Sequence, residues 1–433
     1  MASSQRNDPT AISELSMPES VRQNASLAAR PIEVLSLGDP PAVTLKKALS
    51  VRSVVSTSSE LARRNQEASQ DPHLQTLHQI GKGSFGMVFE HTGTTSVLKV
   101  EQYPIDSVAE SIPKEGSSSA PDNIRSSALW NEMMSHKRLS QAFEKLSHLQ
   151  VSVYIPQVRD FITPERREWW EEDGWRFPAN VNISAEQPRN ILRTQRIFPV
   201  PQVVREALID QYCPANLNKE QEKRNPNNRA CLIRLYLGRK SRSSKFFNLR
   251  NFPLCRDQME SLDLDIDYIA KGMAQTLAIA HWEAGIDARD VEFVLGSAPL
   301  ATRNHIPNVE DLEAMPENTD LLMGKTIGTE LKFMRHSTHM WCLDFNQCRK
   351  ITKDEAGIET CFQAYRDNDP YFPRPSEEHL WQIFKDNYLQ TSRAVVEHRI
   401  DGGSVSDFNV SFRDLPALFP ARIEKHYLEK SER

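Results

Sequence analysis

The stretch Gly81-Lys82-Gly83-Ser84-Phe85-Gly86-Met87-Val88 decides how the rest of the sequence is interpreted. It follows the pattern G-x-G-x-x-G-x-V, in which glycines let backbone N–H groups close over phosphates that a Cβ atom would hold away. Apolar runs over 77–80, 87–90 and 96–100 predict three short strands around it. Because the loop joins two strands rather than a strand and a helix, the pattern favours a nucleotide-binding hairpin over a dinucleotide fold.

Two charged residues follow the glycine loop. Lys99 lies thirteen positions beyond Gly86 on the third predicted strand, where its ammonium group could neutralise phosphate oxygens. The next predicted helix carries Glu132 on the same side as His136, so Glu132 could pair with Lys99 and orient it. Taken singly, Lys99 also fits an ordinary strand-edge lysine and Glu132 a solvated glutamate.

Two acidic segments come after a long apolar helix predicted over 266–280. The first is a charged loop that runs into a β-rich stretch, Gly285-Ile286-Asp287-Ala288-Arg289-Asp290-Val291-Glu292-Phe293-Val294-Leu295. The second is an apolar strand that ends in Asp-Phe-Asn, Met340-Trp341-Cys342-Leu343-Asp344-Phe345-Asn346.

Together these five elements resemble the protein-kinase-like superfamily, over about Leu74 to Tyr388. The resemblance implies an α+β, two-lobed protein-kinase-like fold with a small β-rich N-lobe and a mainly helical C-lobe, binding ATP and Mg²⁺. It implies nucleotide-binding roles for one set of residues: Gly81, Gly83, Ser84, Gly86, Val88, Lys99 and Glu132. It implies catalytic roles for Asp287 and Arg289, and metal-ligand roles for Asp344 and Glu292.

Several departures from the kinase pattern concern activity rather than fold. Gly285-Ile286 stands where His-Arg would precede the aspartate, Glu292 replaces an asparagine, and Asn346 replaces the glycine of Asp-Phe-Gly. No Ala-Pro-Glu sequence follows, which favours the aminoglycoside- or choline-kinase-like branch. The sequence therefore leaves two functions open, a phosphotransferase to a hydroxyl acceptor and a catalytically weak or inactive pseudokinase that acts as a binding or regulatory scaffold.

A narrower resemblance rests on the segment 287–296 together with Leu343-Asp344-Phe345-Asn346. These stretches resemble a fungal family of unknown function whose members are sometimes labelled zinc-finger proteins. The six cysteines show no paired C-x-x-C spacing, so we expect no structural zinc. A zinc-dependent DNA-binding protein remains a third hypothesis, which the negative charge and the cysteine spacing oppose.

The chain divides into three predicted parts. Residues 1–70 are rich in Ser, Ala, Pro and Arg and predict a flexible tail, with a short transient helix over 45–55. Residues 74–238 predict the N-lobe, with a hinge at 231–238 and inserts at about 110–123 and 160–190. Residues 239–433 predict the helical C-lobe, with an acidic insert at about 297–332.

The composition narrows the choice of partners. The net charge is −5 and no basic block stands out, which disfavours a nucleic-acid partner. No apolar run approaches the roughly 20 residues that span a bilayer, and no secretory signal is visible, so we expect an intracellular protein, cytoplasmic or nuclear. A nucleotide, together with an unidentified phosphate acceptor or protein partner, is the expected set of partners.

Overall fold

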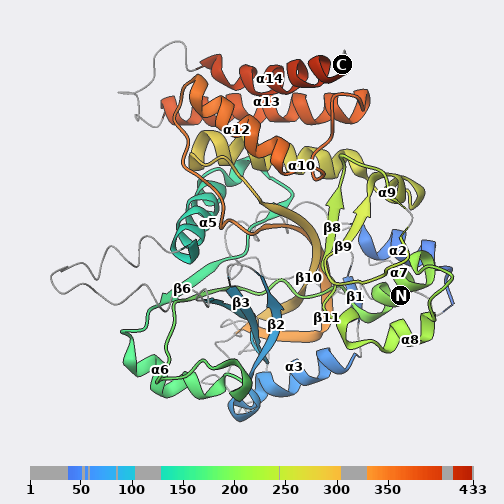
Figure 1. Cartoon of the computed structure of the whole chain (residues 1–433), viewed down its shortest axis with the longest axis vertical. Coiled ribbons are helices and arrows are strands. Elements are labelled where there is room, and N and C mark those ends of the chain that lie inside the picture. Colours follow the sequence, from blue (N-terminus) through green and yellow to red (C-terminus); the bar gives the residue numbers. More distant parts are fainter. Residues whose placement is uncertain are drawn as a thin grey trace, which may run out of the picture.

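The computed structural model describes residues 38–50, 54–56, 59–83, 86–102, 128–242, 244–303, 329–401 and 413–431. It is a mixed α+β structure with two sheets and a layer of helices (Figure 1), which confirms the predicted α+β class. Ser84 of the glycine loop, the insert at 110–123 and the acidic centre of the insert at 297–332 lie outside the described residues.

The first sheet is antiparallel and has five strands in the order β2-β3-β4-β7-β6. The strands are β2 (Leu77–Lys82), β3 (Gly86–His91), β4 (Ser96–Glu101), β6 (Val158–Ile162) and β7 (Ile191–Gln195). Buried and half-buried residues alternate along β4, as expected for a strand with one face on a core. The three strands predicted around the glycine loop are all present.

The predicted insert at 160–190 packs against this sheet. It contains α6 (Arg167–Asp173) and the short 3₁₀ turns Gly174–Arg176 and Ala179–Val181. Trp169 and Trp170 are buried in the same cluster as Phe89 and Ile191 of the sheet, whereas Trp175 is 61% exposed. Two of the three tryptophans of this insert therefore pack into the core of the first sheet.

The second sheet has a path of five strands in the order β1-β11-β10-β8-β9, and a sixth strand, β5, pairs with β11. The strands are β1 (Val54–Ser56), β5 (Val153–Tyr154), β8 (Ile233–Tyr236), β9 (Phe252–Cys255), β10 (Glu292–Arg303) and β11 (Thr329–Leu343). The β10–β11 hairpin reaches into what was predicted as a polar insert. The half expected to be mainly helical thus contributes strands as well, and β8 belongs to this sheet rather than to the first.

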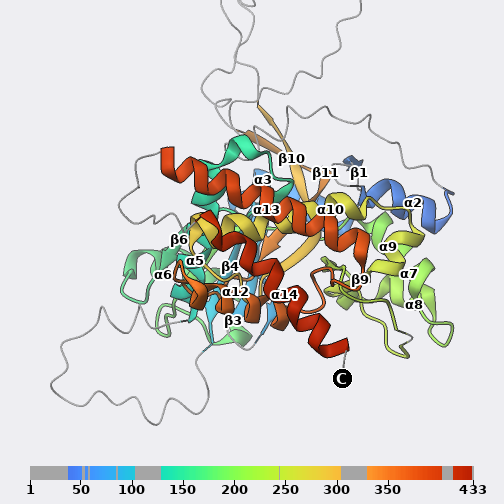
Figure 2. The same ribbon diagram turned by 90° about the horizontal axis from the view of Figure 1, so that it is seen from above.

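The longest helices lie together at one end of the molecule (Figure 1). The main ones are α5 (Ala128–Lys145), α10 (Ile266–Ile279), α12 (Glu355–Asp367), α13 (Glu378–Asp401) and α14 (Leu415–Ser431). Figure 2 shows α13 lying over α10, whose residues from Ile269 to Ile279 are buried apart from Lys271. None of the described helices is both long and apolar enough to span a membrane.

The shorter helices and turns lie between the longer elements along the chain. They are α7 (Gln202–Tyr212), α8 (Lys219–Arg224), α9 (Arg256–Ser261) and the 3₁₀ turns Pro72–Leu74, Ser147–Leu149 and Pro226–Asn228. A π-helical turn, Ala280–Ala284, extends α10 and ends at Gly285, which has a left-handed backbone. Gly285 thus ends the long buried helix just before the charged loop.

The flexible tail predicted over 1–70 is wrong from residue 38 onward. Helix α2 (Pro41–Leu49) buries Leu45 and Leu49 in the main core, and α3 (Glu60–Gln70) is capped by the Ser59 hydroxyl. The Asn65 side chain of α3 accepts a hydrogen bond from the backbone of Gly93 at 3.0 Å. Helices this short are marginal alone, so tertiary packing rather than local propensity orders them.

Three histidines in the core should make stability depend on pH. Burial lowers the pKa of His136 to about 4, that of His281 to about 3 and that of His336 to about 4. Unfolded histidine titrates near 6.5, so between about pH 6.5 and 4 the unfolded chain binds more protons than the folded one. The three neutral, buried histidines therefore contribute fully to the free energy of unfolding above about pH 6.5. That contribution is lost as the pH falls toward 4.

Urea unfolding from pH 7 to pH 4.5 measures this loss. In the variant His281→Phe, the free energy of unfolding should depend less steeply on pH, because one proton-binding group is gone. The slope should fall by about 1.4 kcal/mol per pH unit below pH 6. The exposed His73 offers the matched control, since His73→Gln should leave the slope unchanged. An unchanged slope in His281→Phe would contradict the prediction.

Candidate functional site

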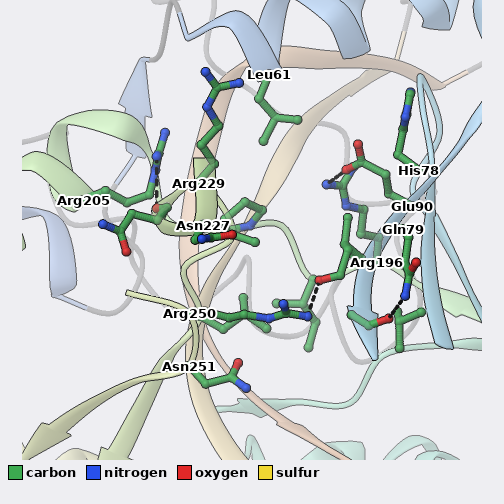
Figure 3. A pocket seen from close by; sticks show the side chains of 18 of the residues that line it. Leu61, His78, Gln79, Glu90, Arg196, Arg205, Asn227, Arg229, Arg250 and Asn251 are labelled. Atoms are coloured by element: carbon green, nitrogen blue, oxygen red, sulfur yellow. Dashed lines mark hydrogen bonds and ion pairs between the residues drawn. The ribbon is translucent and has the colours of Figure 1, made fainter. Parts of the chain in front are cut away.

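A cavity of about 1010 Å³ is lined by residues from both sheets. Its walls include the glycine hairpin (Gly81, Gly83, Gly86), Lys99 and Asp344. Figure 3 shows another part of its wall, where arginine and asparagine side chains face Glu90 and His78 across the opening. Its size fits a nucleotide or another small molecule.

Lys99, Glu132 and Asp344 meet at this cavity although they lie far apart in the sequence. The Lys99 Nζ lies 2.7 Å from Oε2 of Glu132 and 3.3 Å from Oδ1 of Asp344. Lys99 is on β4, Glu132 is on α5, and Asp344 follows β11. The structure thus brings together one predicted nucleotide-binding pair and one predicted metal ligand.

The electrostatics of this group are those of a partly buried cation between two carboxylates. Burial opposes the charge of Lys99, but the carboxylates of Glu132 and Asp344 outweigh it and raise its pKa. Burial raises the pKa of Glu132 even though Lys99 opposes that shift. Lys99 therefore stays charged at neutral pH.

Side chains of helix α5 contact the Asp-Phe-Asn segment directly. The Asn131 amide donates to the backbone carbonyls of Asn346 and Cys348, both at 3.0 Å. The rings of His136 and Phe345 lie 4.6 Å apart between centroids. These contacts fix Glu132 relative to Asp344, because both residues belong to the elements that are joined.

Asp344 has a strained backbone. Its φ is +65°, in the left-handed region that non-glycine residues seldom adopt. Such strain is kept where surrounding structure forces it, and it clusters at functional sites. The strained residue here is the one whose carboxylate meets Lys99.

Asp287 lies behind the cavity wall rather than on it. It is 1% exposed, and its Oδ1 accepts hydrogen bonds from the backbone N–H groups of Arg289 at 3.1 Å and Arg349 at 2.8 Å. Burial raises its pKa, and its Oδ2 has no hydrogen-bond partner among the described residues. Arg289 pairs with Asp367, so neither predicted catalytic side chain lines the cavity.

Asp290 and Glu292 do line the cavity, next to Asp344. Glu292 is paired with Leu343 across the β10–β11 register, so it lies beside Asp344, and it forms an ion pair with Arg234. Burial raises the pKa of Asp290 and raises that of Glu292 to about 7. The sequence reasoning missed Asp290 and Arg234; a signal for Asp290 was its place in the same charged loop, five residues from Gly285.

The hairpin has a glycine at position 86 for a different reason than at position 83. A Cβ atom on Gly86 would lie 2.6 Å from the Val100 carbonyl oxygen, so the pairing of β3 with β4 itself requires a glycine there. Gly83 has open space around it, and its N–H donates to the Gly86 carbonyl at 2.9 Å. Gly83 is thus the hairpin position that leaves room for a ligand.

The two predicted metal ligands, Asp344 and Glu292, both line the cavity. Among the residues that the structure describes, no group of three or more His, Cys, Asp or Glu side chains could hold a metal ion by itself. Asp344 and Glu292 supply two carboxylates, and Mg²⁺ is commonly bound by one or two carboxylates plus substrate phosphates. The six cysteines are buried and unpaired by disulfides.

The fold and cavity define a mixed α+β protein with a buried lysine–carboxylate group at a small-molecule-sized cavity. A family model described as "Zinc finger protein", a domain of unknown function, matches residues 340–399. This match supports the predicted resemblance to a family with that label, and it covers the Asp-Phe-Asn segment, α12 and most of α13. No curated protein and no solved structure matches the chain.

Proposed function

We propose that the chain is a kinase-like protein that binds Mg·ATP in the cavity below the glycine hairpin. The observation that carries the proposal is the meeting of Lys99 with Glu132 and Asp344 beside that hairpin. The first sheet supports it as well, because its order β2-β3-β4-β7-β6, with α5 between β4 and β6 in the sequence, is that of a kinase-like N-lobe. The Lys-on-strand, Glu-on-helix arrangement is the one that orients a phosphate-binding lysine in kinases.

Each residue has a physical role in this proposal. Lys99, held by Glu132, would brace nucleotide phosphates, and Asp344 with Glu292 would hold Mg²⁺. Bound Mg²⁺ would neutralise the charge that develops on the transferred phosphoryl group. Arg234 already offsets part of the negative charge of Glu292, so the extra carboxylate at this position is tolerated.

The reaction that the site could support is phosphoryl transfer to an alcohol. The acceptor oxygen would bond to the γ-phosphorus, the bond from that phosphorus to the bridging oxygen would break, and ADP would leave. The hydroxyl proton would pass to a carboxylate at the cavity. Asp290 and Glu292 both line it with raised pKa values. We assign the proton to Asp290, because Glu292 pairs with Arg234 and is proposed to hold Mg²⁺. The catalytic role predicted for Asp287 stays a prediction, with its position favouring a role in holding the loop.

The pseudokinase scaffold remains the second candidate function. The observation that favours it is the burial of Asp287 and the engagement of Arg289 with Asp367, which leave both residues away from the cavity. It predicts no turnover, with ATP binding that is either weak or purely structural. An assay of ADP release in the presence of Mg·ATP separates the two functions.

Thermal unfolding with and without Mg·ATP tests the binding proposal. Mg·ATP should raise the Tm of the wild type, and Lys99→Met should lose most of that rise because no cation remains to meet the phosphates. Lys145→Met is the matched control, since Lys145 pairs with Glu283 on the surface and should keep the full rise. A rise that Lys99→Met retains in full would refute the proposed site.

A further inference from the structure

The cavity holds more positive than negative charge. Ten Lys or Arg residues line it, against six Asp or Glu residues. Only one of the ten, Lys99, belongs to the proposed nucleotide site described above, and Arg234 is neutralised by Glu292. Most of the remaining cations are arginines, which we call the arginine wall: Arg64, Arg196, Arg205, Arg229 and Arg250. Figure 3 shows all of them except Arg64 with labels.

One side of the arginine wall has two guanidinium groups on one carboxylate. Arg64 and Arg196 both pair with Glu90, which is 2% exposed. Arg196 is 3% exposed, and its Nε and Nη1 have no hydrogen-bond partner among the described residues. Two guanidinium groups share one carboxylate, so this side carries an excess positive charge. Burying a cation without full compensation costs free energy, and a bound anion would reduce that cost.

Arg205 on the facing side and Arg250 between the two sides pair with no carboxylate among the described residues. Arg205 is 9% exposed, its Nη1 donates to the Asn228 carbonyl at 3.3 Å, and its Nε has no partner in the part of the chain that the structure describes. Within the described residues, the Arg250 side chain donates to the Ile80 carbonyl, at 2.8 Å. In Figure 3, Arg205 and Arg229 stand opposite Arg196 and Glu90, with Arg250 between the two sides.

We propose that the arginine wall is a second binding site, which takes the phosphate groups of a phosphorylated small molecule. Guanidinium groups from two sides of a concave cavity suit phosphate, because their planar forks donate pairs of hydrogen bonds to its oxygens. The site does not use Lys99 or Asp344 and so goes beyond the proposed nucleotide site. The two sites share one cavity, so a ligand on the arginine wall would lie beside a nucleotide bound at Lys99.

Tripolyphosphate, tested in the Lys99→Met background, separates this site from the nucleotide site. We expect it to raise the Tm of Lys99→Met, and Arg205→Gln in the same background to bind it about ten- to a hundredfold more weakly. Without ligand, Arg205→Gln should melt at the same temperature or higher, because a buried and uncompensated cation has been removed. A merely structural arginine would instead lower the Tm when replaced.

The matched control is Lys223→Met, at a lysine that lines the same cavity but is already paired with Asp210 and Glu220. It should bind tripolyphosphate as tightly as the background. Equal binding by Arg205→Gln, or equal weakening by Lys223→Met, would overturn the proposal in favour of diffuse charge attraction. If Mg·ATP fails to stabilise the wild type while tripolyphosphate still requires Arg205, the nucleotide proposal fails and the second site stands.

Discussion

ATP turnover is expected to fall by about 10²- to 10⁴-fold when Asp290 is replaced with asparagine, the usual contribution of a general base. Asp290 lines the cavity near Asp344, and the Gln347 amide holds its Oδ2 at 2.5 Å. Its φ of +63° lies in the region that asparagine tolerates at least as well as aspartate, so the fold should be kept. Mg·ATP binding should change little, because Lys99 and Asp344 remain in place.

ADP release, together with nucleotide binding by titration calorimetry, measures both effects. Asp287→Ala is the comparison, because it removes an acceptor for the N–H groups of Arg289 and Arg349 and should lower the Tm. Turnover that survives Asp290→Asn but is lost in Asp287→Asn, with the Tm unchanged, would return the catalytic role to Asp287. No turnover in the wild type, with Mg·ATP bound, would establish the scaffold function.

The second large effect concerns stability. Replacing Glu90 with glutamine should reduce the free energy of unfolding by about 3–5 kcal/mol, the range for breaking a buried ion pair by removing one partner. Glu90 and Arg196 are both almost fully buried, and Arg64 shares the same carboxylate. The neutral amide would leave two guanidinium charges without their common anion.

Urea unfolding measures this loss against a matched exposed pair. Glu60→Gln breaks the pair between Glu60 and Arg229, whose side chains are 72% and 56% exposed, and should cost less than about 1 kcal/mol. Adding Arg196→Met to Glu90→Gln should recover part of the stability, because the stranded buried charge is removed. If Glu90→Gln costs no more than Glu60→Gln, the charge of Arg196 is compensated in another way.

The local patterns predicted the elements around the site well. The strands near the glycine loop, the helix with Glu132 and the buried helix α10 all follow from periodicity, because one face of each packs on a core. Helix α3 was missed, and α2 was predicted only as a short transient helix with other bounds, because their apolar stripes are short. These two helices are stabilised by contacts with distant parts of the chain, such as the hydrogen bond from the Gly93 N–H to the Asn65 side chain.

The sequence by itself determined the α+β class, the hairpin and the charged residues at Lys99, Glu132 and Asp344 that we propose to bind a nucleotide. Only the tertiary structure decided that Asp290, rather than Asp287, reaches the cavity, since both lie in one loop and only backbone geometry separates them. It alone assembled the arginine wall, whose members come from segments between residues 64 and 250. Single arginines give no local signal, because their meaning depends on which carboxylates the fold places beside them.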